Sequence, residues 1–267
     1  MLQIRLLKEG IVLLKEKAHN EDGVSSFQAL MISTASRVGT GNIAGVATAL
    51  AAGGAGAIFW MWVMAFVGAA SAFVESTLAQ IYKERDGEAF RGGPAYYIEK
   101  ALGSRFFGII FALLLIACFI FGFNGLQSYN VSSALAYYFD DQHLAGLLVG
   151  CILTIASAAV IFGGVHRIGI ISSTIVPIMA GLYIILGIYI TLSNASQLPS
   201  IFQMIFQNAF ECTGNLWWLC GILCHAWNQR GLFSNEAGMG SSPISHASVD
   251  DANAVEQGFW GIFEVFF

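Results

Sequence analysis

Residues 38–45, Val38-Gly39-Thr40-Gly41-Asn42-Ile43-Ala44-Gly45, place three glycines within seven residues of one apolar segment. Glycine costs about 1 kcal/mol per position in a helix relative to alanine, so this run is predicted to unwind or distort the helix that contains it. In transporters, a helix broken in mid-membrane offers free N–H groups to a carboxylate and free C=O groups to a cation. The alternative interpretation is a face through which a neighbouring helix packs closely.

The glycine run opens the first of three long tracts without Asp, Glu, Lys or Arg, which cover residues 38–74, 106–139 and 168–210. About 20 apolar residues suffice to cross a bilayer, and 56% of the chain is hydrophobic while only 11% is charged. Such a composition excludes a water-soluble surface and predicts an all-α, polytopic helix bundle in a lipid bilayer. The net charge of −5, with no basic stripe, argues against nucleic-acid binding.

Six membrane spans are predicted, and a further one starts near Gln257. The third span, at residues 106–138, is too long for an upright helix and is expected to tilt strongly or to break. Residues 1–26 mix charges with leucines and isoleucines, which is typical of an amphipathic segment at the membrane surface. The spans are placed at residues 27–51, 56–82, 106–138, 144–164, 168–193 and 200–228.

The positive charges predict the orientation of these spans. All twelve lysines and arginines fall on one side of the bilayer in this arrangement, whereas the loops around residues 53–56, 140–143 and 193–203 have none. Cytoplasmic loops carry an excess of Lys and Arg. The amino end and the loop 83–105 are therefore expected in the cytoplasm, with Asp140 and Asp141 outside.

Four stretches resemble the alanine or glycine:cation symporter family, also called the sodium:alanine/glycine symporters. They occur in the expected order and extend the likeness over nearly the whole chain. They are Val38 through Thr48, Gly56-Ala57-Ile58-Phe59-Trp60-Met61-Trp62, Phe90-Arg91-Gly92-Gly93-Pro94-Ala95-Tyr96-Tyr97, and Gly231-Leu232-Phe233-Ser234-Asn235-Glu236-Ala237-Gly238-Met239-Gly240-Ser241.

The resemblance implies a leucine-transporter-type inverted repeat in the inner (plasma) membrane, which imports alanine or glycine with Na⁺ or H⁺ by alternating access. The transporter domain would cover residues 27–267, with the first repeat at about 27–193 and the start of the second at about 200–267. It would be incomplete at both ends, so the alternative function is a membrane fragment that does not transport. Na⁺ would be a coupling ion, no other cofactor is expected, and no protein partner is implied.

The same resemblance assigns site residues. Thr40, Gly41 and Asn42 match the unwound substrate-binding run, and Val38 and Ser36 stand where this fold offers oxygens to Na⁺. Gln127 belongs to an Asn-Gly-x-Gln pattern and either faces the substrate or forms an interhelical hydrogen bond.

Gly214 and Leu216 match a segment that shapes the substrate pocket. In this chain Trp217 and Trp218 follow them directly. One of the two indoles is expected to fill part of the pocket and to restrict the substrate to glycine. The alternative is that this protein no longer binds an amino acid.

Arg37 directly precedes the first matching stretch and Glu236 lies within the fourth. The two are predicted to form an ion pair at the inner gate, with two unrelated charges as the alternative. Cys220, Cys224 and His225 lack a paired half-site of zinc-like spacing, so a packed core is favoured over a metal site. The sequence shows no catalytic constellation, and an enzyme is not expected.

Overall fold

The first membrane segment consists of two short helices rather than one. In the computed structural model, α2 (Ser26–Arg37) and α3 (Thr40–Gly53) are separated by Val38 and Gly39. The break confirms the predicted distortion of the first span, and it lies at the first two residues of the run, Val38 and Gly39. The structure describes residues 26–87, 89–135, 138–139, 142–210, 231, 234–249 and 253–266.

The second and third segments are long apolar helices. After Gly54 and Ala55, α4 (Gly56–Ile81) follows α3. The third predicted span is a continuous rod of α6 (Arg105–Ala117), a π-helical turn η1 (Cys118–Phe123) and α7 (Asn124–Leu135). The π turn is a local widening that is frequent at functional sites, and it takes the place of the break that the length of this span suggested.

A small structure in the loop 83–105, absent from the sequence prediction, joins α4 to α6. Strands β1 (Glu84–Asp86) and β2 (Ala89–Arg91) form an antiparallel hairpin, which α5 (Pro94–Leu102) follows. Gly93 has φ +118° directly before Pro94. Glycine adopts this backbone readily and proline suits the first helical position, so the Gly-Pro pair sets the start of α5.

Four further elements follow up to Phe210. α8 (Gln142–Ile161) and α9 (Gly164–Ser193) match the fourth and fifth predicted spans. A 3₁₀ turn η3 (Ala195–Gln197) leads to α10 (Leu198–Phe210), the start of the sixth. The remainder of that predicted span lies outside the described residues.

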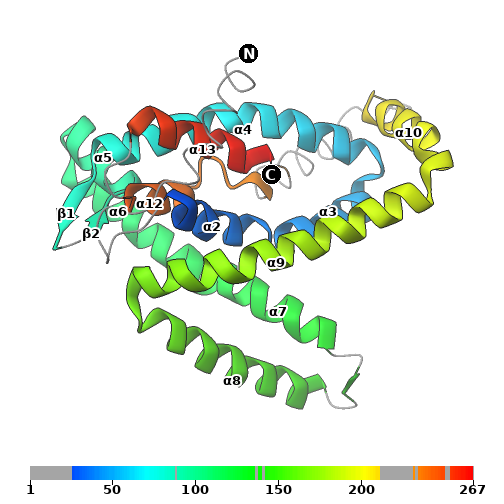
Figure 1. Cartoon of the computed structure of the whole chain (residues 1–267), viewed down its shortest axis with the longest axis horizontal. Helices are drawn as coiled ribbons and strands as arrows, with labels where there is room; N and C mark the ends of the chain where they lie inside the picture. The colour runs from blue at the N-terminus through cyan, green and yellow to red at the C-terminus, as the bar shows by residue number, and fades with distance from the viewer. Residues whose placement is uncertain are drawn as a thin grey trace.

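Two helices from the end of the chain return to its beginning. α12 (Ser241–Ala247) packs against α2 and α4, and α13 (Ala254–Phe266) lies along α4 (Figure 1). A Cβ placed on Gly261 of α13 would lie 2.7 Å from the carbonyl oxygen of Ala72, so the two helices touch through their backbones. α2 is held between these helices and α9 by a core of Leu30, Met31, Val176 and Trp260.

The outer faces of the long helices suit lipid. Among the described residues, three helices are long and apolar enough to cross a membrane, at Gly56–Ile81, Arg105–Leu135 and His166–Ser193. Large apolar side chains on them are open to the surroundings; the exposed fraction is 79% for Phe121. Such extended apolar faces mark an all-α membrane helix bundle.

Candidate functional site

The backbone opens between α2 and α3. The last helical hydrogen bond of α2 runs from the Val38 N–H to the Thr34 carbonyl (2.8 Å), and α3 begins with the N–H groups of Asn42 and Ile43 on the Gly39 carbonyl (3.2 Å each). Gly39 between them is extended, with φ −117° and ψ −161°. The first N–H groups of a helix lack partners within it, so the start of α3 presents donors with a positive dipole end to an anionic group.

This opening lies slightly before the predicted one. Thr40, Gly41 and Asn42 were expected in the unwound run, but they form the first turn of α3. Gly39 alone supplies the extended backbone, and the helix resumes at the next residue. The N–H groups of Thr40 and Gly41 in this first turn are among those without helical acceptors, whereas the Asn42 N–H bonds to the Gly39 carbonyl.

Asn42 and Gln127 both lie at the break. The Asn42 side chain donates from Nδ2 to the Arg37 carbonyl (2.6 Å) across the opening, and it accepts a hydrogen bond from the Ser234 hydroxyl. A Cβ built on Gly39 would lie 3.2 Å from Nε2 of Gln127, so α7 brings this amide beside the break. The structure thus unites two of the predicted substrate residues from distant parts of the chain.

A polar cavity of about 190 Å³ adjoins the opening. Its wall comes from α2, the start of α3, the segment at Ser234 and the end of α13. It is lined by Thr34, Arg37, Val38, Asn42, Ser234, Glu264, Val265 and Phe266. A cavity of this kind beside free helix-end groups can accept a small zwitterion.

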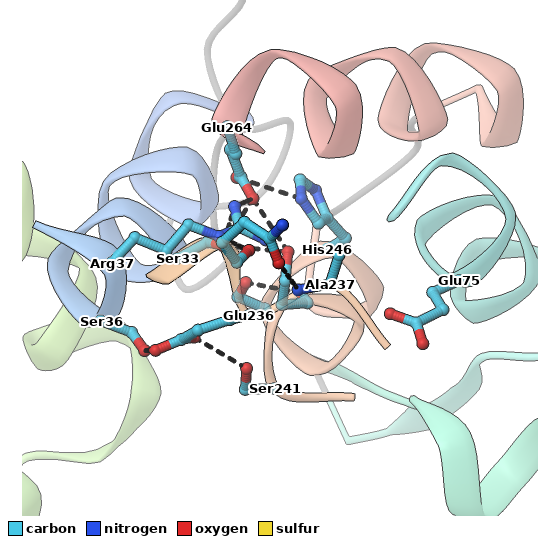
Figure 2. A network of polar contacts seen from close by, with 12 residues as sticks. Ser33, Ser36, Arg37, Glu75, Glu236, Ala237, Ser241, His246 and Glu264 are labelled. Carbon is cyan, nitrogen blue, oxygen red and sulfur yellow. Dashed lines mark hydrogen bonds and ion pairs between the residues drawn. The ribbon is translucent and has the colours of Figure 1, made fainter. Parts of the chain in front are cut away.

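Arg37 is the centre of a buried charge network (Figure 2). Its Nη1 forms an ion pair with Oε2 of Glu264, and its Nε donates to the Asn235 carbonyl (3.0 Å). The same Glu264 oxygen accepts hydrogen bonds from Ser33 (2.6 Å) and Ser242 (2.8 Å). The network therefore ties α2 to α12 and α13 beside the break.

His246 completes this network from the opposite side. Its Nε2 lies 3.1 Å from Oε1 of Glu264, and its Nδ1 lies 2.7 Å from Oε1 of Gln257. Sequence reasoning assigned no role in a site to His246, Glu264 or Gln257. The available signal was the acidic Glu264 among the apolar residues near the end of α13, because such residues usually face a partner.

The predicted gate pair is not the pair that the structure contains. Arg37 pairs with Glu264, whereas the carboxylate of Glu236 accepts hydrogen bonds from the hydroxyls of Ser36 (2.6 Å) and Ser241 (3.0 Å). Arg37 does contact the residue directly before Glu236, since its Nε donates to the backbone carbonyl of Asn235. The Glu236 side chain instead reaches Ser36, the predicted cation ligand.

Glu75 of α4 lies on the other side of this region and accepts a hydrogen bond from the Gly238 N–H (3.2 Å). The negative charge of Glu75 also acts on the phenol of Tyr97 on α5. Burial raises the pKa of Tyr97, and the charge of the Glu75 carboxylate raises it further. Gly214 and Leu216, like the cysteines and tryptophans of residues 211–230, lie outside the described residues.

Comparison with known proteins agrees with these features. The profile of the sodium:alanine symporter family matches residues 1–267. The amino-acid carrier protein AlsT of Bacillus subtilis is 47% identical over 266 residues, which cover 100% of this chain and 57% of AlsT.

Two other relatives carry sodium in their names. The probable sodium/glutamine symporter GlnT of B. subtilis is 46% identical over 99% of this chain and 55% of its own length. The sodium/alanine symporter AgcS of Methanococcus maripaludis is 41% identical over 92% of this chain and 56% of its own length. The chain thus spans little more than half the length of the relatives it matches.

Proposed function

The chain belongs to the sodium:alanine symporter family, and from this premise we propose that it serves the sodium-coupled import of alanine or glycine by alternating access. The observation that carries the proposal is the opening at Val38 and Gly39, with the Gln127 amide and a polar cavity of about 190 Å³ beside it. The chain spans little more than half the length of its relatives, so transport by the chain itself is part of the proposal and is what the uptake experiment below measures.

The binding mode follows from the ends of the two half-helices. The substrate carboxylate takes the N–H groups of Thr40 and Gly41 at the positive end of α3. The substrate amine takes carbonyl oxygens at the end of α2 and the side-chain oxygen of Gln127. Gly214 and Leu216 would form the wall toward the substrate side chain. A pocket of this size suits a small side chain better than a long one.

A leucine-transporter-type arrangement is part of this proposal. The broken α2–α3 segment would open the first inverted repeat, which ends with α9, and α10 would lead into the second. The coupling ion is Na⁺ in this scheme, in keeping with the names of two relatives. H⁺ coupling is the competing possibility.

Uptake in proteoliposomes tests the proposed function. Purified chain is reconstituted, and labelled alanine, glycine and glutamine are supplied under an inward Na⁺ gradient, an inward H⁺ gradient or neither. We expect accumulation of alanine or glycine that requires the Na⁺ gradient. A chain that accumulates no substrate under any gradient would instead be a membrane protein without transport of its own.

Replacing Gln127 by alanine is expected to raise the concentration of alanine needed for half-maximal uptake by about tenfold, because a hydrogen bond to a charged substrate group is lost. Asn130→Ala is the matched control. Asn130 is an amide on the same helix, and its Nδ2 donates to the Leu126 carbonyl of that helix. Equal uptake constants for both variants would remove Gln127 from the binding site.

The membrane orientation is a further part of the proposal, with the amino end and the loop 83–105 in the cytoplasm of a multi-pass inner (plasma) membrane protein. Single cysteines at Glu99 and Asn194, both exposed, test it after Cys118 and Cys151 are replaced by serine along with the other cysteines. A membrane-impermeant maleimide is expected to label Asn194→Cys in intact cells and Glu99→Cys only after the cells are opened. Labelling of both from outside would contradict the orientation.

A further inference from the structure

The carboxyl end of α12 is held by two side chains from the end of α4. Nε2 of Gln80 donates to the His246 carbonyl, and Nζ of Lys83 donates at 2.8 Å to the carbonyl of Val249, two residues after α12. Gln80 lies in the last turn of α4, and Lys83 follows that helix by two residues. The last carbonyls of a helix have no partners within it, and lysine side chains can supply donors to them. We call Gln80 and Lys83 the clasp of α12.

The ammonium of Lys83 reaches a further element. It lies 4.2 Å from the centre of the Phe90 ring on β2, within the range of a cation–π interaction. The segment that follows β2 touches α12 directly, since a Cβ built on Gly92 would lie 2.8 Å from Cβ of Ala247. Lys83 therefore lies where the end of α4, the hairpin and the end of α12 meet (Figure 1).

Another face of α12 borders open space. Ile244 and Ser245 of this helix line a cavity of about 710 Å³, whose walls also include Phe111 of α6. α12 has only seven residues, and isolated helices this short are not stable by themselves. Its position is therefore set by its contacts, and the cavity leaves room for it to move.

Movement of this end would uncover a buried apolar side chain. Val249 has 1% of its surface exposed and packs against Ala29 and Ile32 of α2, the helix that leads to the opening. The segment before α12 also reaches the opening, because the Ser234 hydroxyl donates to the Asn42 side chain of α3. The position of α12 is thus tied to the helix break from both of its ends.

We propose that Lys83 is a positioning residue in a releasable contact. Its bond to the Val249 carbonyl holds α12 against α4 and α2, and loss of that bond lets the end of α12 swing into the cavity. The contact suits reversible release, because it consists of side-chain bonds to carbonyls and can break without disrupting the hydrogen bonds within a helix. A use of this movement in transport rests on the proposed function, whereas the release itself is a property of the chain without substrate.

The rate at which a buried thiol is alkylated measures this release. Val249→Cys is introduced into a chain whose native cysteines are replaced by serine, and the purified full chain in detergent is treated with N-ethylmaleimide. A buried thiol reacts only from the open state, so its rate follows the population of that state. Ala57→Cys in the same background is the reference, because Ala57 is 0% exposed and packs in a separate cluster with Ala49 of α3.

Lys83→Met removes the ammonium and keeps the apolar part of the side chain. It is expected to raise the alkylation rate of Val249→Cys by about tenfold, because a hydrogen bond from a charged donor is lost, and to leave that of Ala57→Cys within about twofold. Lys83→Arg keeps a charged donor and is expected to keep the rate low. Lys100→Met is the matched control, because Lys100 lies in the same loop and its Nζ donates to the Tyr82 carbonyl at the end of α4; it is expected to stay within about twofold.

Faster alkylation of Val249→Cys alone supports the releasable contact. The proposal is overturned if Lys83→Met raises this rate no more than Lys100→Met does, if it raises the rates of both thiols alike, or if Lys83→Arg reacts as fast as Lys83→Met. Should Lys83→Met fail to fold, Gln80→Met removes the other half of the clasp and decides by the same comparison. These measurements use neither an amino acid nor an ion gradient, so a failure of uptake leaves them unaffected.

Discussion

Replacing Arg37 by methionine is expected to lower the free energy of unfolding by about 3 to 5 kcal/mol, because it deprives the buried carboxylate of Glu264 of its guanidinium partner. The guanidinium and Glu264 are 4% and 0% exposed, so water cannot replace the lost partner. The Asn235 carbonyl loses its donor at the same time. Thermal unfolding of the purified chain in detergent, followed by circular dichroism, measures the change.

The double variant Arg37→Met, Glu264→Met separates the charge from the packing. It removes both charges while keeping apolar volume, and such replacements of buried ion pairs are often neutral or stabilising. We therefore expect it to regain most of the lost stability. Arg105→Met is the surface control, since Arg105 is 79% exposed and lies 4.0 Å from Glu99; an exposed pair contributes about 0 to 1 kcal/mol. A single Arg37 variant as stable as this control would contradict the prediction.

Replacing Gly261 by leucine is expected to lower the free energy of unfolding by about 3 kcal/mol or more, because the new side chain overlaps with α4. Even a Cβ at this position would lie 2.7 Å from the Ala72 carbonyl oxygen and 2.6 Å from the Ser76 hydroxyl. The obstacle includes backbone, so α13 and α4 must separate to admit the new side chain. Because Glu264 lies one turn further along α13, separation also draws it away from Arg37.

Gly187→Leu provides the matched control for this second variant. Gly187 is a helical glycine of α9, and a Cβ there meets nothing within 4 Å. Leucine has the higher helix propensity, so this variant is expected to be at least as stable as the unchanged chain. Thermal unfolding compares the two, and a Gly261 variant as stable as the Gly187 variant would show that the helices do not pack as closely as described.

The sequence allowed the membrane helices and the first opening to be predicted, because both depend on local composition. Apolar tracts without charges located α4, the α6–α7 rod, α8 and α9 to within a few residues. The glycine run predicted a weakened helix near Gly39, but it could not distinguish which glycine would be extended. The hairpin at Glu84–Arg91 was missed because its strands are only three residues long and carry charges.

The pairing of charges could not be predicted from the sequence, because it depends on how distant helices dock. Arg37 and Glu264 are 227 positions apart, and only the packing of α13 along α4 brings them together. Glu236 was the plausible partner by motif, yet the left-handed turn at that residue points its carboxylate toward Ser36. Local patterns therefore identified Arg37 and Glu236 as important but not their partners.

The π-helical turn at Cys118–Phe123 governs the direction in which the second half of its rod faces. Each residue advances an α-helix by about 100°, so one residue more or fewer before Asn124 would rotate every side chain of α7 around the axis. Gln127 would then leave the neighbourhood of Gly39 and face a different quarter of the bundle. The π-helical turn thus sets the direction in which the Gln127 amide faces at the break.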